Sequence, residues 1–223
     1  MFINTNTKHK IKLKNVVFWM LLLKMCILFG QDNSPKKVII IDPGHGGKDT
    51  GAIGINGIQE KDIVLNIAKH MLTLNETFLN NSYNIYLTRY KDTLISLSDR
   101  SRLTKAIHPD IFISLHCNAS KSIAKGNEVY IHNSCSSFTK ESIALGLSIL
   151  NESTHKLGFR KRGVKFADFQ VLRETKAICP SSLVELGYVT NTDEEEYLLK
   201  NKNIRALALA TLLGITNYIK TEL

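Results

Sequence analysis

The sequence predicts a single α/β domain built on a mostly parallel β-sheet. Short apolar runs rich in β-branched residues alternate along the chain with longer segments whose apolar residues recur at helical spacing. This alternation is typical of parallel strands joined by helices, with functional loops beyond the carboxyl ends of the strands. The length of 223 residues fits one hydrophobic core, because single cores commonly serve roughly 100 to 250 residues.

The first elements follow this alternation. The β-branched run at 38–41 predicts a strand that is covered on both faces, and it stops at the turn residues 42–44. A helix is expected at 60–78, where apolar residues form one stripe, and the segment 84–88 returns as a strand.

Capping signals define two later helices. Ser96 is expected to cap a helix that Pro109 prevents from continuing. Thr192 with Glu195 forms a capping box for a helix through 199, and the acids at 193–196 are therefore predicted to be structural. The remaining expected elements are strands at 111–115, 128–131, 170–172 and 183–186, and helices at 142–157 and 204–219.

The first thirty residues are predicted to form a signal peptide. Lysines at 8, 10, 12 and 14 precede an apolar run from Val16 to Phe29 that only Lys24 interrupts, which is the layout of a secretory leader. Because the run is shorter than the roughly 20 residues that span a bilayer, cleavage near Gly30 is expected, with an uncleaved, membrane-tethering leader as the alternative. A lipid anchor on Cys26 is disfavoured because small residues do not precede it. The expected organisation is a signal peptide at 1–30, a linker at 31–36 and a catalytic domain at 37–223.

The net charge and the cysteine content limit which partners and which cellular compartment are expected. Without the leader the formal charge falls from +9 to +4, because the leader holds five lysines and no acid. This balance suits an anionic polymer, and no basic cluster with interleaved aromatic residues indicates nucleic acid. We expect an exported monomer in the periplasm, with an extracellular location as the alternative. Cys117, Cys135 and Cys179 then remain without a CxxC pair, and each is predicted to be a small buried side chain rather than a disulfide partner or metal ligand.

Four titratable side chains stand at strand ends or helix starts and are expected to point into one cleft. His45 follows the first strand, Glu60 opens the first helix and His116 ends another strand. Two histidines and one glutamate form a known ligand set for catalytic zinc, which leaves one position open for water. We therefore predict that His45, Glu60 and His116 hold one Zn²⁺. Glu185, inside an apolar run, is predicted to move the proton of the attacking water to the leaving amine.

Each of these residues also has a structural alternative. His45 could hydrogen-bond its own glycine-rich turn, Glu60 could complement the helix dipole, and His116 could be satisfied at a strand end. Glu185 could pair with a buried cation, although desolvation in an apolar strand would raise its pKa and suit an acid-base role. His132 also follows a strand and is the least secure of the histidines left outside the site. No HExxH, GxSxG or complete phosphate-binding loop occurs, so the metalloprotease helix, the serine-hydrolase elbow and a nucleotide site are not indicated.

Several further blocks occur in a fixed order between Val38 and Ile219: Ile41-Asp-Pro-Gly-His45-Gly-Gly, Gly51-Ala-Ile-Gly54, Glu60-Lys61, Thr88-Arg89 with Asp92, Leu97 and Arg100, Ser114-Leu-His116-Cys-Asn-Ala119, Gly163-Val-Lys165, Val171-Leu-Arg173, and Val184-Glu185-Leu-Gly187 with Asn191. Together they resemble the zinc-dependent N-acetylmuramoyl-L-alanine amidases of the type-3, AmiC-like family. The resemblance implies the same zinc ligands, catalysis by Glu185 and a twisted six-stranded sheet flanked by helices. It also implies hydrolysis of the bond between N-acetylmuramic acid and L-alanine in peptidoglycan. We expect a role in wall remodelling and daughter-cell separation, with recycling as the alternative. Asn118, Lys165 and Arg173 lie in matching blocks and are candidate substrate contacts.

The resemblance also frames the remaining expectations. Cys117 stands where the family usually has an aliphatic residue or alanine, and we expect it to make the site sensitive to oxidation. Some family members carry a helical insertion that plugs the site until an activator removes it, but the segment between Ile131 and Gly163 has room for little more than one helix. An open cleft that needs no activator is therefore expected. A zinc exopeptidase on a related scaffold and a wall-binding protein without turnover remain as alternatives, and Glu185 speaks against the second.

Overall fold

The computed structural model describes residues 14–22 and 35–222 of the chain. Its two compact units, Met1–Pro35 and Lys36–Leu223, are described separately. In the first unit, residues 14–22 form a helix whose large apolar side chains are exposed. Most of the expected signal peptide and linker, with Cys26, lies outside the described residues. Among the described helices, none combines the length and the apolar character needed to cross a membrane.

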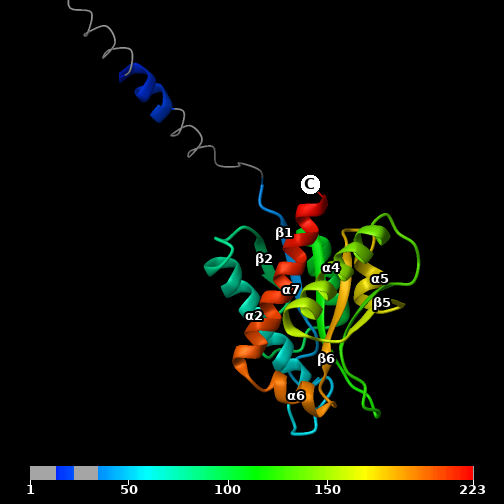
Figure 1. Ribbon diagram of the computed structural model, residues 1–223. Helices are drawn as coiled ribbons and strands as arrows, with labels where there is room; N and C mark the ends of the chain where they lie inside the picture. Colours follow the sequence, from blue (N-terminus) through cyan, green and yellow to red (C-terminus); the bar gives the residue numbers. More distant parts are fainter. Residues whose placement is uncertain (1–13, 23–34, 223) are drawn as a thin grey trace, which may run out of the picture. The chain divides into compact units, whose positions relative to one another are not determined.

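The second unit is built on a mixed sheet of six strands. These are β1 (Val38–Pro43), β2 (Asn84–Leu87), β3 (Ile111–Asn118), β4 (Asn127–His132), β5 (Lys161–Ala167) and β6 (Ser181–Tyr188). Their order in the sheet is β2-β1-β3-β6-β4-β5 (Figure 1). Strands β2, β1, β3 and β6 are parallel, whereas β4 runs antiparallel to β6 and parallel to the edge strand β5. The predicted α/β class and mixed sheet are confirmed.

Helices cover both faces of this sheet, but unequally. They are α2 (Glu60–Thr77), α3 (Leu97–Ile107), α4 (Thr139–Leu157), α5 (Gln170–Thr175), α6 (Thr192–Leu198) and α7 (Asn201–Glu222). Helices α2, α4 and α7 pack together over one face, which is the side seen in Figure 1. The shorter helices α3 and α5 pack against each other at the opposite face. That second face is therefore covered only in part.

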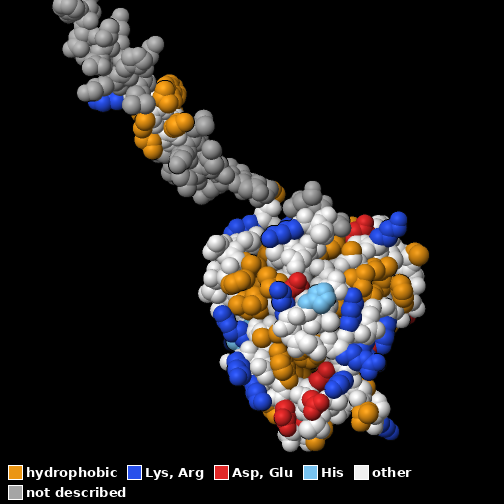
Figure 2. All heavy atoms as spheres, in the orientation of Figure 1, with side chains coloured by type: hydrophobic (Ala, Val, Ile, Leu, Met, Phe, Trp, Pro, Cys, Tyr) orange, Lys and Arg blue, Asp and Glu red, His pale blue; other side chains and the backbone are white. Residues whose placement is uncertain are grey.

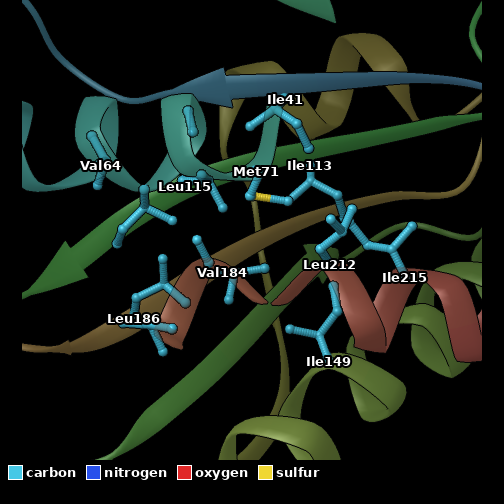
Figure 3. Packing of buried hydrophobic residues seen from close by; sticks show 14 of the residues in the cluster. Ile41, Val64, Met71, Ile113, Leu115, Ile149, Val184, Leu186, Leu212 and Ile215 are labelled. Atoms are coloured by element: carbon cyan, nitrogen blue, oxygen red, sulfur yellow. The ribbon is translucent and has the colours of Figure 1, made fainter. Parts of the chain in front are cut away.

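The main core lies between the sheet and helices α2, α4 and α7. Figure 3 shows Ile113 and Leu115 of β3 and Val184 of β6 pointing toward Met71 of α2 and Leu212 of α7. All five side chains are fully buried. Burying large aliphatic side chains contributes about 1.5–3 kcal/mol each, so this face holds the sheet rigid for the chemistry on the other face. A smaller cluster on the α3–α5 side contains Ile40, Phe112, Val171, Leu172 and Leu183.

Three element predictions were wrong. The segment predicted as a strand at 170–172 begins helix α5, because three residues are too few to separate a strand period from a helix period. Strand β5 was not predicted, since it is a basic, half-exposed edge strand with no apolar run to mark it. The side chain of Asn191, rather than Thr192, caps α6 by accepting the amide hydrogen of Glu194.

Other local predictions are confirmed. Ser96 caps α3 by accepting the amide hydrogen of Asp99. Of the four acids at 193–196, Glu194 and Glu195 are buried, and their carboxylates accept backbone hydrogen bonds from distant loops, so these two are structural as predicted. Asp193 and Glu196 are exposed, and the prediction does not hold for them. Figure 2 shows acidic side chains gathered near α6, while basic side chains are scattered around the rest of this face. Cys117 and Cys179 are buried as predicted, but Cys135 is exposed because it follows β4 in a surface loop.

Candidate metal centre

Three side chains from separate elements converge at the carboxyl ends of the central strands. His45 lies in the loop after β1, Glu60 is the first residue of α2, and His116 lies near the end of β3. Each offers one ligand atom, and these atoms all lie within 4.8 Å of one another. Glu60 Oε1 is 3.1 Å from His45 Nε2 and 2.9 Å from His116 Nδ1. This spacing is compatible with one shared metal ion, and the convergence expected from the sequence is present.

Glu60 is a buried carboxylate that is held as an anion. Its Oε2 accepts the amide hydrogen of Ala52 at 2.8 Å, and its Oε1 accepts that of Cys117 at 3.0 Å. Burial by itself would raise the pKa of Glu60, but hydrogen bonds with His116 and His45 outweigh that effect and hold the pKa far below its usual range. The side chain therefore faces inward, as predicted from its place at the helix start.

His45 is oriented by a second carboxylate. Its Nδ1 is hydrogen-bonded to Asp49 Oδ2 at 2.9 Å, which turns Nε2 toward Glu60. A carboxylate behind a histidine fixes the ring and its tautomer, an arrangement that recurs behind metal-binding histidines. His45 itself adopts a left-handed backbone conformation, with φ of 59°. The loop must therefore be held in place by its surroundings.

Two buried arginines hold that loop through its carbonyl groups. Arg89 donates to the carbonyls of Pro43 and Gly44 at 3.0 and 2.7 Å. Arg100 donates to the carbonyls of Pro43 and His45, both at 2.7 Å, and also to the buried carboxylate of Asp42 at 2.5 Å. The backbone that presents His45 is thus fixed by charge-assisted hydrogen bonds rather than by its own sequence.

Two glycines allow the close packing that brings the ligands together. A Cβ on Gly44 would lie 2.3 Å from the ring of His116. A Cβ on Gly51, whose φ is +65°, would lie 2.5 Å from Glu60 Oε2. The glycines of these sequence blocks therefore make room for the ligand side chains.

Glu185 lies beside this cluster on the neighbouring strand. It is the register partner of His116 across β3 and β6. Its Oε2 is buried and has no hydrogen-bond partner among the described residues. Burial raises the pKa of Glu185 to about 7, with Glu60 and Glu128 adding to the effect and the two histidines opposing it. An acid with such a pKa exchanges a proton readily near neutral pH.

A cavity of about 470 Å³ opens in front of these residues. His45, His116 and Glu185 form its polar floor. Its walls are mainly apolar and come from the segment before α3 and from the starts of α3 and α5, including Leu94, Ile95, Leu97, Phe169 and Val171. The polar side chains of Ser96, Arg100 and Gln170 line it as well. The segment between β4 and β5 does not cover it, because α4 packs with α7 on the opposite face of the sheet. The described residues thus leave this cleft open.

A second polar cluster lies on the other side of Glu185, and sequence reasoning missed its centre. Glu128 of β4 is buried and is the register partner of Glu185. Asn118 and Lys165, two of the three candidate substrate contacts, are hydrogen-bonded to it, together with Arg162. The signal that could have found Glu128 is the one used for Glu185, an acid inside an apolar strand.

The remaining candidates lie elsewhere. Arg173 is paired with Asp168, which also contacts His132, so neither residue belongs to the metal cluster. Burial raises the pKa of the Cys117 thiol well above its usual value, and the nearby Glu60 raises it further. A shielded and protonated thiol is unreactive, which argues against the expected sensitivity to oxidation.

Comparisons with known proteins give matches over most of the chain. A family model described as N-acetylmuramoyl-L-alanine amidase (Amidase_3) matches residues 39–217. The N-acetylmuramoyl-L-alanine amidase CwlM of Bacillus licheniformis is 39% identical over 180 residues, which cover 79% of this chain and 66% of that protein. The crystal structure of N-acetylmuramoyl-L-alanine amidase from Clostridium difficile 630 superposes with a TM-score of 0.77 at 31% identity, covering 85% of this chain and all of that one. The CwlD amidase of Clostridioides difficile, solved in complex with the GerS lipoprotein, gives a TM-score of 0.75 at 25% identity and covers 83% of this chain and all of that one.

Proposed function

The chain belongs to the N-acetylmuramoyl-L-alanine amidase family and is an amide-bond hydrolase that acts on peptidoglycan, and from this premise we propose that it is a zinc enzyme. In this proposal His45, Glu60 and His116 hold one Zn²⁺, and Glu185 is the catalytic acid and base. The observation that carries the proposal is the convergence of three ligand atoms within 4.8 Å beside an acid with a free, buried oxygen.

The donor set fits zinc. Two imidazole nitrogens and one carboxylate oxygen are a ligand set of catalytic zinc sites that keep a position open. The open cavity over His45 and His116 provides space for a substrate at that position. A zinc ion held there supplies Lewis acidity, which polarises the scissile carbonyl and lowers the pKa of a water molecule.

Glu185 moves the proton in the proposed reaction. Burial raises the pKa of its carboxyl group toward neutrality, which suits Oε2 to accept a proton from the attacking water. The same oxygen then delivers that proton to the nitrogen of L-alanine, which leaves as an amine. Arg89 and Arg100 contribute by keeping the His45 loop in place throughout.

Product analysis tests the reaction. The purified, zinc-loaded protein is incubated with peptidoglycan, and the released material is identified by mass spectrometry. Intact stem peptides that begin with L-alanine are the expected product. Single amino acids would indicate an exopeptidase, and no release would indicate a binding protein. The Glu185→Ala variant should keep its zinc, measured by elemental analysis, and lose turnover; normal activity in this variant would contradict the mechanism.

We also propose that the chain is exported to the periplasm as a monomer and serves wall remodelling and daughter-cell separation. Residues 1–30 would be the signal peptide, 31–36 a linker and 37–223 the catalytic domain, on the strength of the basic and apolar leader. Cell fractionation with N-terminal sequencing should find a mature protein that begins near Gln31 in the periplasmic fraction. A full-length protein in the membrane fraction would indicate a tether instead.

The open cleft supports activity without a partner. Because α4 packs away from the site, purified protein should release stem peptides from sacculi without any added protein. The related CwlD amidase was solved with a lipoprotein bound, so the assay should be repeated with the proteins that co-purify from the native envelope. Strong stimulation over a negligible basal rate would contradict the proposal of independence.

A further inference from the structure

We propose that Arg162 and Lys165, held by the buried Glu128, form a subsite that binds a carboxylate of the stem peptide. This inference rests on the proposed function, because it names the substrate group that the same cleft recognises. It assigns the peptide side of the scissile bond to strands β4 and β5.

The subsite lies in line with the catalytic residues. His116 of β3 pairs with Glu185 of β6, and Glu185 pairs in turn with Glu128 of β4, so the three side chains form one row across the sheet. Adjacent strands are about 4.8 Å apart, which puts Glu128 one strand spacing beyond Glu185. A peptide that leaves the scissile bond in this direction extends by about 3.4 Å per residue. The α-carboxylate of its second residue therefore reaches the region of Glu128 and the cations beside it.

Glu128 is saturated by donors and serves as an anchor. Its Oε1 accepts hydrogen bonds from Asn118 at 2.7 Å and Tyr130 at 2.8 Å. Its Oε2 accepts hydrogen bonds from Arg162 at 2.7 Å and Lys165 at 2.5 Å. With both oxygens occupied and only 2% of the side chain exposed, Glu128 has no free acceptor to offer a substrate.

The two cations, in contrast, reach the surface. The side chains of Lys165 and Arg162 are 38% and 26% exposed. Aromatic rings help to hold them, since Arg162 lies 5.2 Å from the ring centre of Tyr188 and Lys165 lies 5.7 Å from that of Tyr130. Two positive charges share one buried negative charge, so the cluster presents an excess of one positive charge beside Glu185.

This excess charge selects one side of the substrate. The lactyl group and the glycan carry no charge at the scissile bond, because the lactyl carboxyl group is engaged in the amide. The stem peptide carries free carboxylates. An arginine and a lysine side by side bind such a group through charge-assisted hydrogen bonds. The cavity on the other side of Glu185 is walled mainly by apolar side chains, among them Leu94, Leu97 and Phe169.

Paired substrates test the proposal. The zinc-loaded full chain is given N-acetylmuramoyl-L-alanyl-D-glutamate and its D-isoglutamine analogue, which differ only in whether the α-carboxyl group of the second residue is free or amidated. The free acid is expected to be cleaved with a kcat/KM about tenfold higher, mainly through a lower KM, because one charge-assisted contact is lost in the amide.

Variants of one strand locate the effect. Lys165→Met and Arg162→Gln should each reduce the preference for the free acid, and the double variant should remove it. Lys165→Arg should restore it, because the positive charge is kept. The control is Lys161→Met, in the same strand, since Lys161 contacts Asn151 away from this cluster. Melting curves for each variant show that the fold is intact.

Each outcome decides the proposal. Equal cleavage of the two substrates by the unmodified enzyme, or equal loss of both in Lys165→Met, would overturn it. If neither substrate is cleaved, the proposed function fails, and binding then decides this inference separately. Tighter binding of L-alanyl-D-glutamate than of its amide to the Glu185→Gln variant, measured by calorimetry, would support the subsite, and equal binding would refute it.

Discussion

The site is built in different ways on the two sides of Glu185. On one side, the metal end, which holds the candidate metal ligands, His45 follows strand β1 and His116 lies near the end of the parallel strand β3. Buried arginines hold the His45 loop by its carbonyl groups. At the β4–β5 end, the strands run in the opposite direction, and one buried carboxylate, Glu128, gathers partly exposed cations. The first end is positioned by buried backbone contacts, and the second by side-chain charge. This difference suits chemistry at one end, where geometry is strict, and recognition at the other, where a side chain must adapt to its ligand.

The largest expected effect is a loss of catalytic rate when Glu185 of β6 is replaced. It distinguishes Glu185 from Glu128, the buried acid of β4 that is its register partner. Glu185→Gln should lower kcat by about 10³-fold or more while zinc content stays unchanged, because proton transfer alone contributes about 10²–10⁴-fold. Steady-state kinetics on muropeptides and elemental analysis measure the two quantities. Glu196→Gln, which changes an exposed acid, is the matched control. A variant of Glu185 that loses its zinc as well would show that this residue belongs to the metal end.

The next effect tests the anchoring of the His45 loop. Arg100→Met leaves the buried carboxylate of Asp42 with the hydroxyl donors Thr88 and Ser114 but without the cation that pairs with it. Breaking a buried ion pair costs about 3–5 kcal/mol of unfolding free energy. Zinc affinity should also fall by about 10- to 100-fold, as is usual when the support of a ligand is removed. Urea unfolding and competition with a zinc chelator measure these changes.

The same helix offers a matched control for Arg100. Arg102 pairs with Asp99, but its side chain is 78% exposed. Arg102→Met should therefore cost less than about 1 kcal/mol and leave zinc affinity unchanged. Equal losses of stability and zinc affinity in the two variants would contradict this. They would show that positive charge on α3, rather than the hydrogen bonds from Arg100 to the loop carbonyls, stabilises the metal end.

The two ends also differ in how far they could be predicted from the sequence. His45, Glu60 and His116 each sit beside a local signal, such as a turn after an apolar run or the start of an amphipathic stripe. Glu185 stands out in the sequence as an acid within an apolar strand. The parallel βα units carry these signals, so local pattern predicts the fold class and the convergence of these side chains.

The β4–β5 end depends on contacts that local pattern does not record. Strand β5 is a basic edge strand, and its pairing with β4 joins residues that lie 34 or 35 positions apart in the sequence, such as Asn127 with Lys161 and Tyr130 with Lys165. Arg162 meets Glu128 only through that pairing. The reversal of β4 against β6, which aligns Glu128 with Glu185, has no counterpart in the sequence of either strand. The cluster around Glu128 could therefore not be predicted from the sequence, because it forms only through long-range strand pairing.

A smaller effect concerns the stability of the β4–β5 end in acid. Burial alone would raise the pKa of Glu128, but hydrogen bonds from Lys165, Arg162 and Tyr130 outweigh it and leave the pKa below its usual value of 4.5. Since the folded pKa is lower than the unfolded one, Glu128 stabilises the fold above about pH 4.5, and this contribution is lost as the pH falls through the folded pKa. The Glu128→Gln variant should unfold more easily than the native protein at pH 7, and the two unfolding free energies should converge in acid. A constant difference from pH 7 to pH 3 would contradict the lowered pKa.

The smallest effect is a difference in thiol reactivity. The cysteine beside the metal end is buried, whereas a cysteine in a surface loop is exposed. Within residues 36–223, iodoacetamide should label Cys135, which is exposed after β4, and should leave amidase activity unchanged. Cys117 and Cys179 are buried, and burial raises the pKa of Cys179 to about 11, so both should react only after unfolding. Peptide mapping of the native and the unfolded protein measures the labelling. Modification of Cys117 in the native protein, with loss of activity, would mean that the metal end opens to solvent and is less firmly held than its buried contacts indicate.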